Sequence, residues 1–98
     1  RRDYMVILKD ETGERPIGIV HVEFTGWEVG LIIGERHAGA GLGGQAMALL
    51  LAKLTVGQKV RAVVHPLNQA SRKLFESLGF VATGQTVRGQ LEYLKELT

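Results

Sequence analysis

The sequence predicts a single α+β domain in which a mixed β-sheet carries two helices, in the order βββ-α-β-α-ββ. Three observations lead to this fold class. Runs typical of β-strands, separated by turn formers, fill the first third of the chain. Helical spacing of apolar residues begins only after a glycine-rich segment in the middle. A strand–helix–strand unit follows, and such a unit joins parallel neighbours through a right-handed crossover.

The first three strands are expected over residues 3–9, 17–24 and 27–33. The segment 10–16 is dense in turn formers, and residues 25–26 form a second short turn. Connections this short favour an antiparallel meander, because parallel neighbours need a crossover of a dozen or more residues.

The rest of the chain alternates helix and strand. Residues 45–54 contain only helix formers and no β-branched residue, and their apolar side chains surround the helix nearly completely, which indicates burial against the sheet. The next strand covers residues 59–65 and ends before Pro66. The last two strands are expected over residues 80–86 and 90–97.

A second helix is expected over residues 69–78, with Asn68 as its N-cap. Gly79 in the left-handed conformation and Phe80 folded back onto the helix form the expected C-terminal stop.

Composition and charge exclude several classes of protein. The chain has no cysteine, hence no disulfide, thiolate zinc site or cysteine nucleophile, and its three histidines are too scattered to predict a metal site. A net charge of +2 indicates neither a nucleic-acid nor a membrane partner. No apolar run is as long as the roughly 18 residues that a membrane-spanning helix needs, and the N-terminus has no apolar signal region. We therefore expect a cytoplasmic protein without metal, with residues 1–98 forming one domain.

Glycine is concentrated in one segment: five of the thirteen glycines fall between Gly34 and Gly44. Residues 39–44 satisfy the pattern G-x-G-x-x-G between an expected strand and an expected helix. A dinucleotide-binding unit would also need an acidic residue about 20 positions further on to hold the ribose. The chain has no Asp or Glu between Glu35 and Glu76, so this interpretation is disfavoured.

The same small residues still predict an anion site. Their backbone N–H groups can converge on a phosphate, while the following helix turns its positive end toward it. A pyrophosphate-bearing ligand fits such a site. Glycine in this segment is also consistent with a flexible loop, or with a helix packed so tightly on the sheet that no side chain fits between them.

Two segments resemble motifs of the GNAT superfamily of acyl-CoA-dependent N-acetyltransferases. Residues 68–80 (NQASRKLFESLGF) match N-x-x-[AS]-x-x-L-[YF]-x-x-x-G-F, and residues 39–47 resemble the family's pyrophosphate-binding segment. The family's loop pattern fits in two registers, starting at Arg36 or at Ala38, and the second leads into the helix as in the family. The resemblance covers nearly the whole chain. It implies a GNAT-like fold in which two central parallel strands splay apart for acetyl-CoA, with the helices packed on the sheet.

The resemblance also implies which residues bind the cofactor. The backbone of Leu31, Ile32 and Ile33 would pair with pantetheine as an added strand does. Asn68 and Phe75 would contact the cofactor from the second helix. The pyrophosphate would meet the glycine segment, which comprises Ala38, Gly39, Ala40, Gly41, Leu42, Gly43 and Gly44.

The chemistry implied is direct attack of an amine on the acetyl thioester, which needs a base for the amine and an acid for the departing thiolate. Glu28 matches a position where many members carry a glutamate base, and its neighbours Trp27 and Val29 would shield it from water. His65, at the end of the next strand, is the second candidate base. Phe75 stands where many members have a tyrosine acid. Another group or solvent must then protonate the thiolate, or the protein is slow or inactive.

The start of the chain departs from the family as well. Members usually begin with a strand and two helices that wall the acceptor site, whereas this chain opens at what resembles the second strand. An open acceptor side implies a large or protein-like acceptor, a homodimer in which a second copy completes the site, or a degenerate domain. We expect a minimal acetyltransferase that moves an acetyl group from acetyl-CoA to a small-molecule or protein amine. The alternative is a non-catalytic acyl-CoA-binding domain of the same fold.

Overall fold

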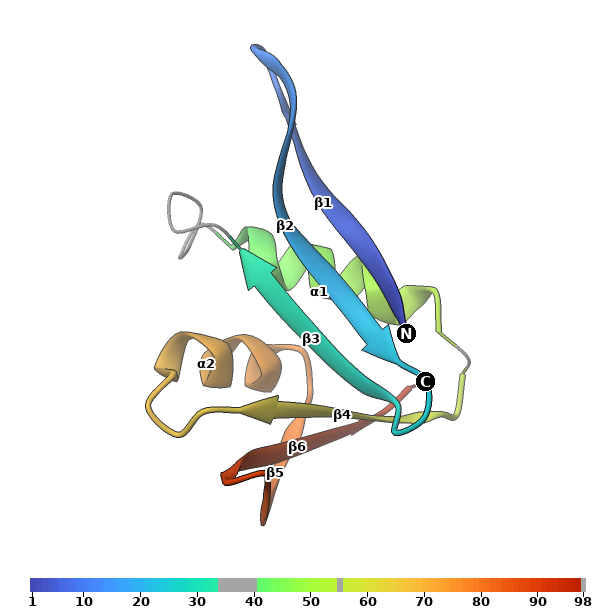
Figure 1. Ribbon diagram of the computed structural model, residues 1–98, viewed down its shortest axis with the longest axis vertical. Helices are drawn as coiled ribbons and strands as arrows, with labels where there is room; N and C mark the ends of the chain where they lie inside the picture. Colours follow the sequence, from blue (N-terminus) through green and yellow to red (C-terminus); the bar gives the residue numbers. More distant parts are fainter. Residues whose placement is uncertain (34–40, 55, 98) are drawn as a thin grey trace.

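The elements of the computed structural model follow the predicted order βββ-α-β-α-ββ (Figure 1). The structure describes residues 1–33, 41–54 and 56–97. The elements are β1 Arg2–Asp10, β2 Gly13–Glu23, β3 Glu28–Ile33, α1 Leu42–Ala52, β4 Lys59–Val64, α2 Gln69–Ser77, β5 Val81–Val87 and β6 Gln90–Glu96. The strands form a six-stranded sheet in the order β1-β2-β3-β4-β6-β5. The predicted α+β class is confirmed.

The sheet is mixed because one central pair is parallel. β1, β2 and β3 form the predicted antiparallel meander. β3 and β4 run parallel, with Glu28 opposite Arg61 and Val29 opposite Ala62. Beyond these two rungs the strands diverge, as their arrowheads show in Figure 1. β6 then pairs antiparallel with both β4 and β5.

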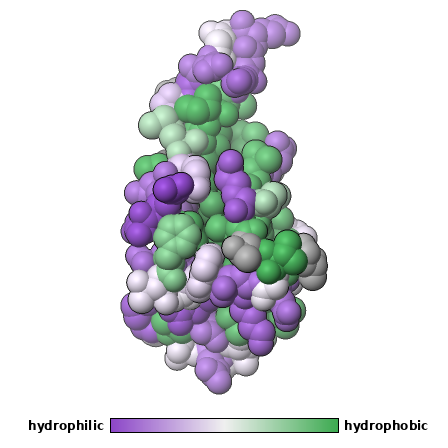
Figure 2. All heavy atoms as spheres, turned by 90° about the vertical axis from the view of Figure 1, so that its right-hand side faces the viewer, coloured by the Kyte–Doolittle hydropathy of each residue, from purple (hydrophilic) through white to green (hydrophobic). Residues whose placement is uncertain are grey.

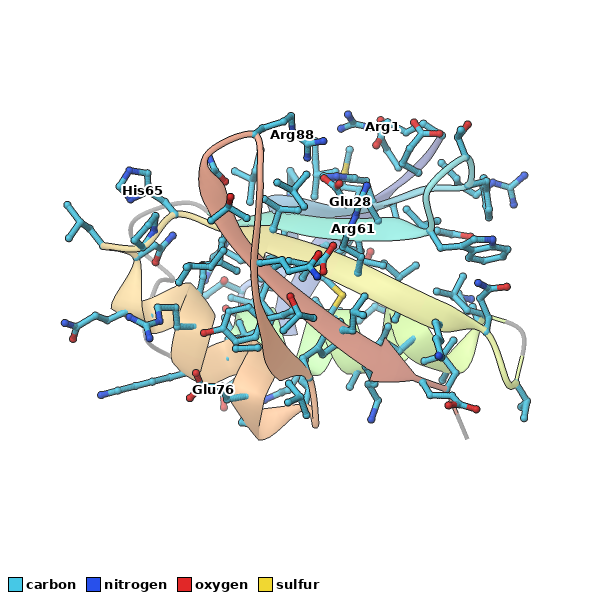
Figure 3. The ribbon with its side chains drawn as sticks, turned by 90° about the horizontal axis from the view of Figure 1, so that it is seen from below. Arg1, Glu28, Arg61, His65, Glu76 and Arg88 are labelled. Carbon is cyan, nitrogen blue, oxygen red and sulfur yellow. The ribbon has the colours of Figure 1, made fainter. Side chains whose placement is uncertain are left out.

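Both helices cover one face of the sheet, and the core lies between them and the strands (Figure 3). Met47 and Leu50 of α1 and Phe75 of α2 are buried there. The strands contribute alternate residues to the same core, namely Val20, Val22, Val29, Val60, Ala62, Val64 and Tyr93. No helix in the described parts of the chain is long and apolar enough to cross a membrane.

The opposite face of the sheet carries no helix within the described residues. Met5 and Ile32 on this face are 64% and 68% exposed. Figure 2 shows the tip of the β1–β2 hairpin as hydrophilic surface above a hydrophobic stretch. Met5 and Ile32 are therefore accessible to a ligand.

The ends of α2 follow the local sequence as predicted. The Asn68 side chain accepts a hydrogen bond from the Ser71 N–H at 3.1 Å, which caps the helix. At the other end Gly79 has a φ of 91°. The Phe80 N–H donates to the Phe75 carbonyl at 3.0 Å, and the two rings meet edge to face. Both the N-cap and the glycine stop are confirmed.

The start of α1 differs from the prediction. The helix begins at Leu42, not at residue 45, so Gly43 and Gly44 belong to its first turn. Glycine lowers helix propensity, which is why the pattern predicted a loop there. Leu49 on the outer side is 68% exposed, so the expected burial holds for one side of the helix only.

Candidate functional site

The divergence of β3 from β4 leaves one edge of β3 open. Residues 30–33 pair with β2 along the other edge but with no described residue of β4. The Trp27 carbonyl accepts from the Arg61 N–H at 2.9 Å, so it faces β4. Because backbone groups alternate along a strand, those of Leu31 and Ile33 face the opening and those of Ile32 face β2. An extended ligand can therefore add to this edge as a further strand.

Three elements meet at the wide end of this opening: the end of β3, the first turn of α1 and the side of α2. A Cβ on Gly43 would lie 2.9 Å from Leu31 Cδ2 and 3.0 Å from Leu74 Cδ1, so these leucine side chains would have to shift to admit it. The first turn of α1 therefore packs closely on β3 and α2 at this position. We use the name β3–β4 cleft for the stretch in which the two strands are unpaired, from the Val29–Ala62 rung to Gly43.

The first turn of α1 offers backbone donors at the wide end of the cleft. The first helical bond runs from the Gln45 N–H to the Gly41 carbonyl at 3.2 Å. The N–H groups of Leu42, Gly43 and Gly44 thus have no acceptor within the helix. No side chain of the described residues caps this turn, which contains no acidic residue. N–H groups without an acceptor in the helix and the positive end of the helix dipole together favour an anion.

Gly41 precedes this turn as its N-cap, with a φ of 79°. A Cβ added there would have no atom within 4 Å among the described residues. The position therefore has room for a side chain, but its backbone favours Gly, Asn or Asp. Ala38, Gly39 and Ala40, the remaining predicted phosphate ligands, lie outside the described residues.

Glu28 lies at the narrow end of the cleft, on the face of the sheet opposite the helices (Figure 3). Arg88 Nη2 lies 2.9 Å from Glu28 Oε1 and 2.8 Å from Oε2, and Arg61 Nη2 lies 3.3 Å from Oε1. Val29 points into the core on the other face and is 2% exposed. It therefore does not shield the carboxylate as expected, and Glu28 is bordered by positive charge instead.

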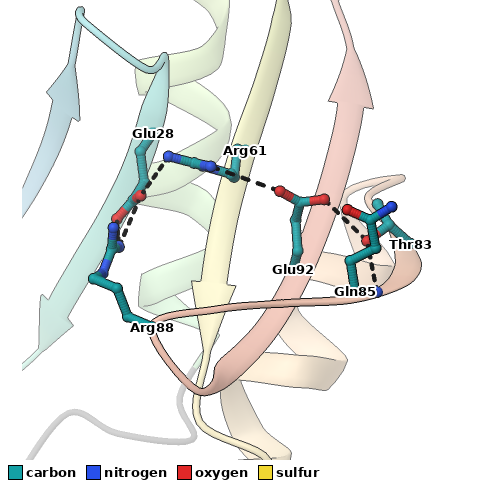
Figure 4. A network of polar contacts seen from close by, with 6 residues as sticks. All are labelled: Glu28, Arg61, Thr83, Gln85, Arg88 and Glu92. Atoms are coloured by element: carbon teal, nitrogen blue, oxygen red, sulfur yellow. Dashed lines mark hydrogen bonds and ion pairs between the residues drawn. The ribbon is translucent and has the colours of Figure 1, made fainter.

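Arg61 joins Glu28 to a second carboxylate (Figure 4). Its Nη1 lies 3.6 Å from Glu92 Oε2, and the Thr83 hydroxyl donates to Glu92 Oε1 at 3.0 Å. Glu28, Arg61, Arg88 and Glu92 come from β3, β4, the β5–β6 turn and β6; we call them the charged cluster. Arg61, Arg88 and Glu92 belong to no sequence motif, and only the register of the sheet brings them to Glu28.

His65 does not join Glu28. It follows β4 by one residue, four positions beyond Arg61, which at about 3.3 Å per residue places it roughly 13 Å further along the strand. Its imidazole is exposed, and Nδ1 accepts from the Leu67 N–H at 3.1 Å. The two candidate bases therefore belong to opposite ends of the cleft, as Figure 3 shows.

The two residues expected to contact the cofactor from α2 have firm structural roles. Asn68 is exposed and caps the helix. The Phe75 ring is 5% exposed and lies in the core, 5.1 Å from the Phe80 ring. Contact of either residue with a cofactor stays a prediction.

The burial of Phe75 decides what a hydroxyl there does. If the para position of the Phe75 ring faced the cleft, Phe75→Tyr would supply a replacement acid and turnover would rise modestly. Because the ring is packed in the core, we expect a loss of about 1–3 kcal/mol from an unpaired buried hydroxyl. The melting temperature should then fall by roughly 4–8 °C per kcal/mol.

Phe80→Tyr is the matched control, since Phe80 is 3% exposed in the same core. Similar losses in the two variants would place both rings in the core in solution. Unchanged stability of Phe75→Tyr together with faster CoA release would contradict this and place the para position in the cleft.

His21 is partly buried on the face that carries the charged cluster. Its ring lies against the backbone of Gly30, where an added Cβ would overlap it, and Nδ1 has no partner among the described residues. Burial, and then the charge of Arg1, lower the pKa of His21 below its ordinary 6.5, whereas Asp3, Glu23 and Glu28 oppose this. The folded state thus disfavours the protonated imidazole.

This shift predicts a loss of stability in mild acid. Between the lowered pKa and 6.5 the unfolded chain binds more protons than the folded chain, so the free energy of unfolding falls as the pH drops below about 6.5. Urea unfolding at pH 7.5 and 5.5 should show a larger loss for the parent than for His21→Gln. Equal losses in the two proteins would exclude His21 as the cause.

An apolar cavity lies away from the cleft. It has a volume of about 460 Å³ and lies between β1, β2 and α1, lined by Tyr4, Leu8, Ile17 and Leu49 among others. None of the candidate bases borders it. The backbone edge and the helix start define the candidate site better than this apolar hollow does, because they supply the directed polar groups that a ligand requires.

A family profile described as an acetyltransferase (GNAT) domain matches residues 1–81 of the chain. No curated protein matches it. A domain from Methanocaldococcus jannaschii has a similar structure, with 31% identity and a TM-score of 0.88 over 97% of this chain. A protein from Bordetella pertussis assigned to the GnaT family of acetyltransferases has 26% identity and a TM-score of 0.68 over 94% of this chain.

The spermidine/spermine N-acetyltransferase SpeG from Vibrio cholerae shares the fold, with a TM-score of 0.67 over 97% of this chain, at 19% identity. The chain spans only part of these proteins: 66% of the archaeal domain, 62% of the Bordetella protein and 67% of SpeG.

Proposed function

The chain belongs to the GNAT acetyltransferase family, and on that premise we propose that it binds acetyl-CoA in the β3–β4 cleft and transfers the acetyl group to an amine. One observation carries the proposal: the parallel strands separate after two rungs, and the open edge leads to a helix start that no side chain of the described residues caps. This arrangement suits a ligand with an extended, amide-bearing arm and a pyrophosphate.

The two ends of such a ligand meet different groups. The backbone of Leu31 and Ile33 is available to the amides of pantetheine. The N–H groups of Leu42, Gly43 and Gly44 are available to the pyrophosphate. The thioester would then lie toward the narrow end of the cleft, where Glu28 is located.

The reaction needs little from the protein beyond position and proton transfer. The amine nitrogen forms a bond to the thioester carbonyl carbon, the carbon–sulfur bond breaks, and CoA leaves as the thiolate. Glu28 accepts the proton that the amine loses, directly or through water. Phe75 cannot donate a proton, so solvent or another group protonates the thiolate.

Calorimetry with acetyl-CoA, CoA and NAD tests the binding step. We expect the two CoA species to bind and NAD not to bind. CoA release with a panel of primary amines and lysine peptides then tests transfer. Binding of NAD in preference to CoA would contradict the proposal in favour of a dinucleotide-binding unit.

A non-catalytic acyl-CoA-binding domain is the second candidate. Phe75 supports it, since no hydroxyl lies at the usual acid position, and so do the two guanidinium groups on Glu28. The Tyr93 hydroxyl does not replace this acid, because it donates to Glu76 at 3.0 Å and lies in the core. Tight binding of acetyl-CoA without CoA release by any amine would establish this alternative.

A further inference from the structure

Arg88 lies at the tip of the β5–β6 hairpin and reaches across β4 to Glu28 (Figure 4). The two residues of the turn, Arg88 and Gly89, have φ angles of 53° and 77°, as in a type I′ turn. Asparagine, aspartate or glycine adopts such angles more readily than arginine does. Turn geometry alone therefore does not account for an arginine at this position.

The two arginines that contact Glu28 differ in how firmly their surroundings hold them. Arg61 is 28% exposed, lies between two carboxylates and packs against the backbone of Gly26. Arg88 is 62% exposed, and Glu28 is its only ion-pair partner among the described residues. Exposed ion pairs of this kind are weak and exchange readily with other cations. Arg88 is thus the partner that can leave.

The charged cluster is balanced, with two carboxylates facing two guanidinium groups. A primary alkylamine, like the lysine side chain, is an ammonium ion at neutral pH. An ammonium ion added beside Arg88 would leave an excess positive charge on Glu28. An ammonium ion that replaces Arg88 keeps the charges of the cluster balanced. It also brings the acceptor nitrogen to the Glu28 carboxylate, which would take its proton.

We propose that Arg88 is a specificity-determining residue that occupies the place of the acceptor on Glu28 and is displaced by a cationic amine. This inference rests on the proposed function, in which Glu28 serves the acceptor. Acceptors that carry a positive charge at the reacting nitrogen release the guanidinium, whereas neutral ones compete poorly with it.

Arg88→Gln removes the competitor. With n-butylamine as acceptor, KM should fall about two- to fivefold, the range of one exposed ion pair, with kcat unchanged. Arg88→Lys keeps the charge and should stay near the parent. Arg15→Gln is the matched control, since Arg15 forms an exposed ion pair with Asp10 at 2.6 Å and should leave both constants unchanged. An unchanged or higher KM in Arg88→Gln would overturn the proposal.

A binding measurement separates this inference from the proposed function. The Nε–H resonance of Arg88, identified by its loss in Arg88→Gln, is followed as n-butylamine is added without acetyl-CoA. We expect a shift in the parent and none in Glu28→Gln. If the resonance shifts but turnover assays show no CoA release, the displacement of Arg88 is supported and only the proposed transferase function is contradicted. If CoA is released but the resonance does not shift, the role of Arg88 is overturned. If neither is seen, the role of Arg88 and the proposed function are both overturned.

Discussion

Gly41→Asp should weaken acetyl-CoA binding by a hundredfold or more and leave the chain folded. The added carboxylate stands at the start of α1, where the pyrophosphate would meet the N–H groups of the first turn, which no side chain of the described residues caps. Two like charges about 4 Å apart near a protein surface repel each other by roughly 4 kcal/mol, and each 1.4 kcal/mol is about tenfold in affinity. Calorimetry with acetyl-CoA measures the loss.

Gly41→Asn is the matched control for this variant. Asparagine has nearly the same size as aspartate and shares its tolerance of a positive φ, and space for a side chain exists at this position. It should bind acetyl-CoA far more tightly than the aspartate variant. Equal affinity of the two folded variants would mean that the start of α1 does not bind the pyrophosphate.

Glu28→Gln should lower turnover by roughly 10²–10⁴-fold, because an amide of the same shape cannot accept the proton of the amine. Acetyl-CoA affinity should change little, since the proposed pyrophosphate site is at the other end of the cleft. The measurement is CoA release at saturating acetyl-CoA over a range of pH.

Glu23→Gln is the control for loss of a carboxylate, since Glu23 on β2 lies directly opposite Glu28 in the sheet. Its turnover should stay near that of the parent. Unchanged turnover of Glu28→Gln at every pH would remove Glu28 from the mechanism and leave His65 as the candidate base. The melting temperature of Glu28→Gln, measured on the same samples, reports what the contacts of Glu28 with its two arginines contribute to stability.

Features set by neighbouring residues were predictable from the sequence. The turns that separate β1, β2 and β3 are short, so the meander could be derived without tertiary information. The Asn68 cap and the stop at Gly79 and Phe80 depend on side chains within one helical turn of each end. The central parallel pair followed from the strand–helix–strand order.

The glycine-rich segment shows where this reasoning ends. Local propensity predicted a loop through Gly44, yet the helix begins at Leu42 because α1 packs on β3 and α2 at Gly43. Close contact between distant elements outweighs the propensity of two glycines, which is of the order of 1 kcal/mol each. The same packing brings the helix start to the open edge of β3.

By itself the sequence determined the fold class, the order of the elements, the helix ends of α2 and the family motifs, because each depends on periodicity or on residues close in the chain. The tertiary structure alone decided which charges meet Glu28. Arg61 reaches it through the parallel register, and Arg88 through a hairpin sixty positions away. Register and hairpin direction result from packing over the whole sheet, so no local pattern in the chain encodes that contact.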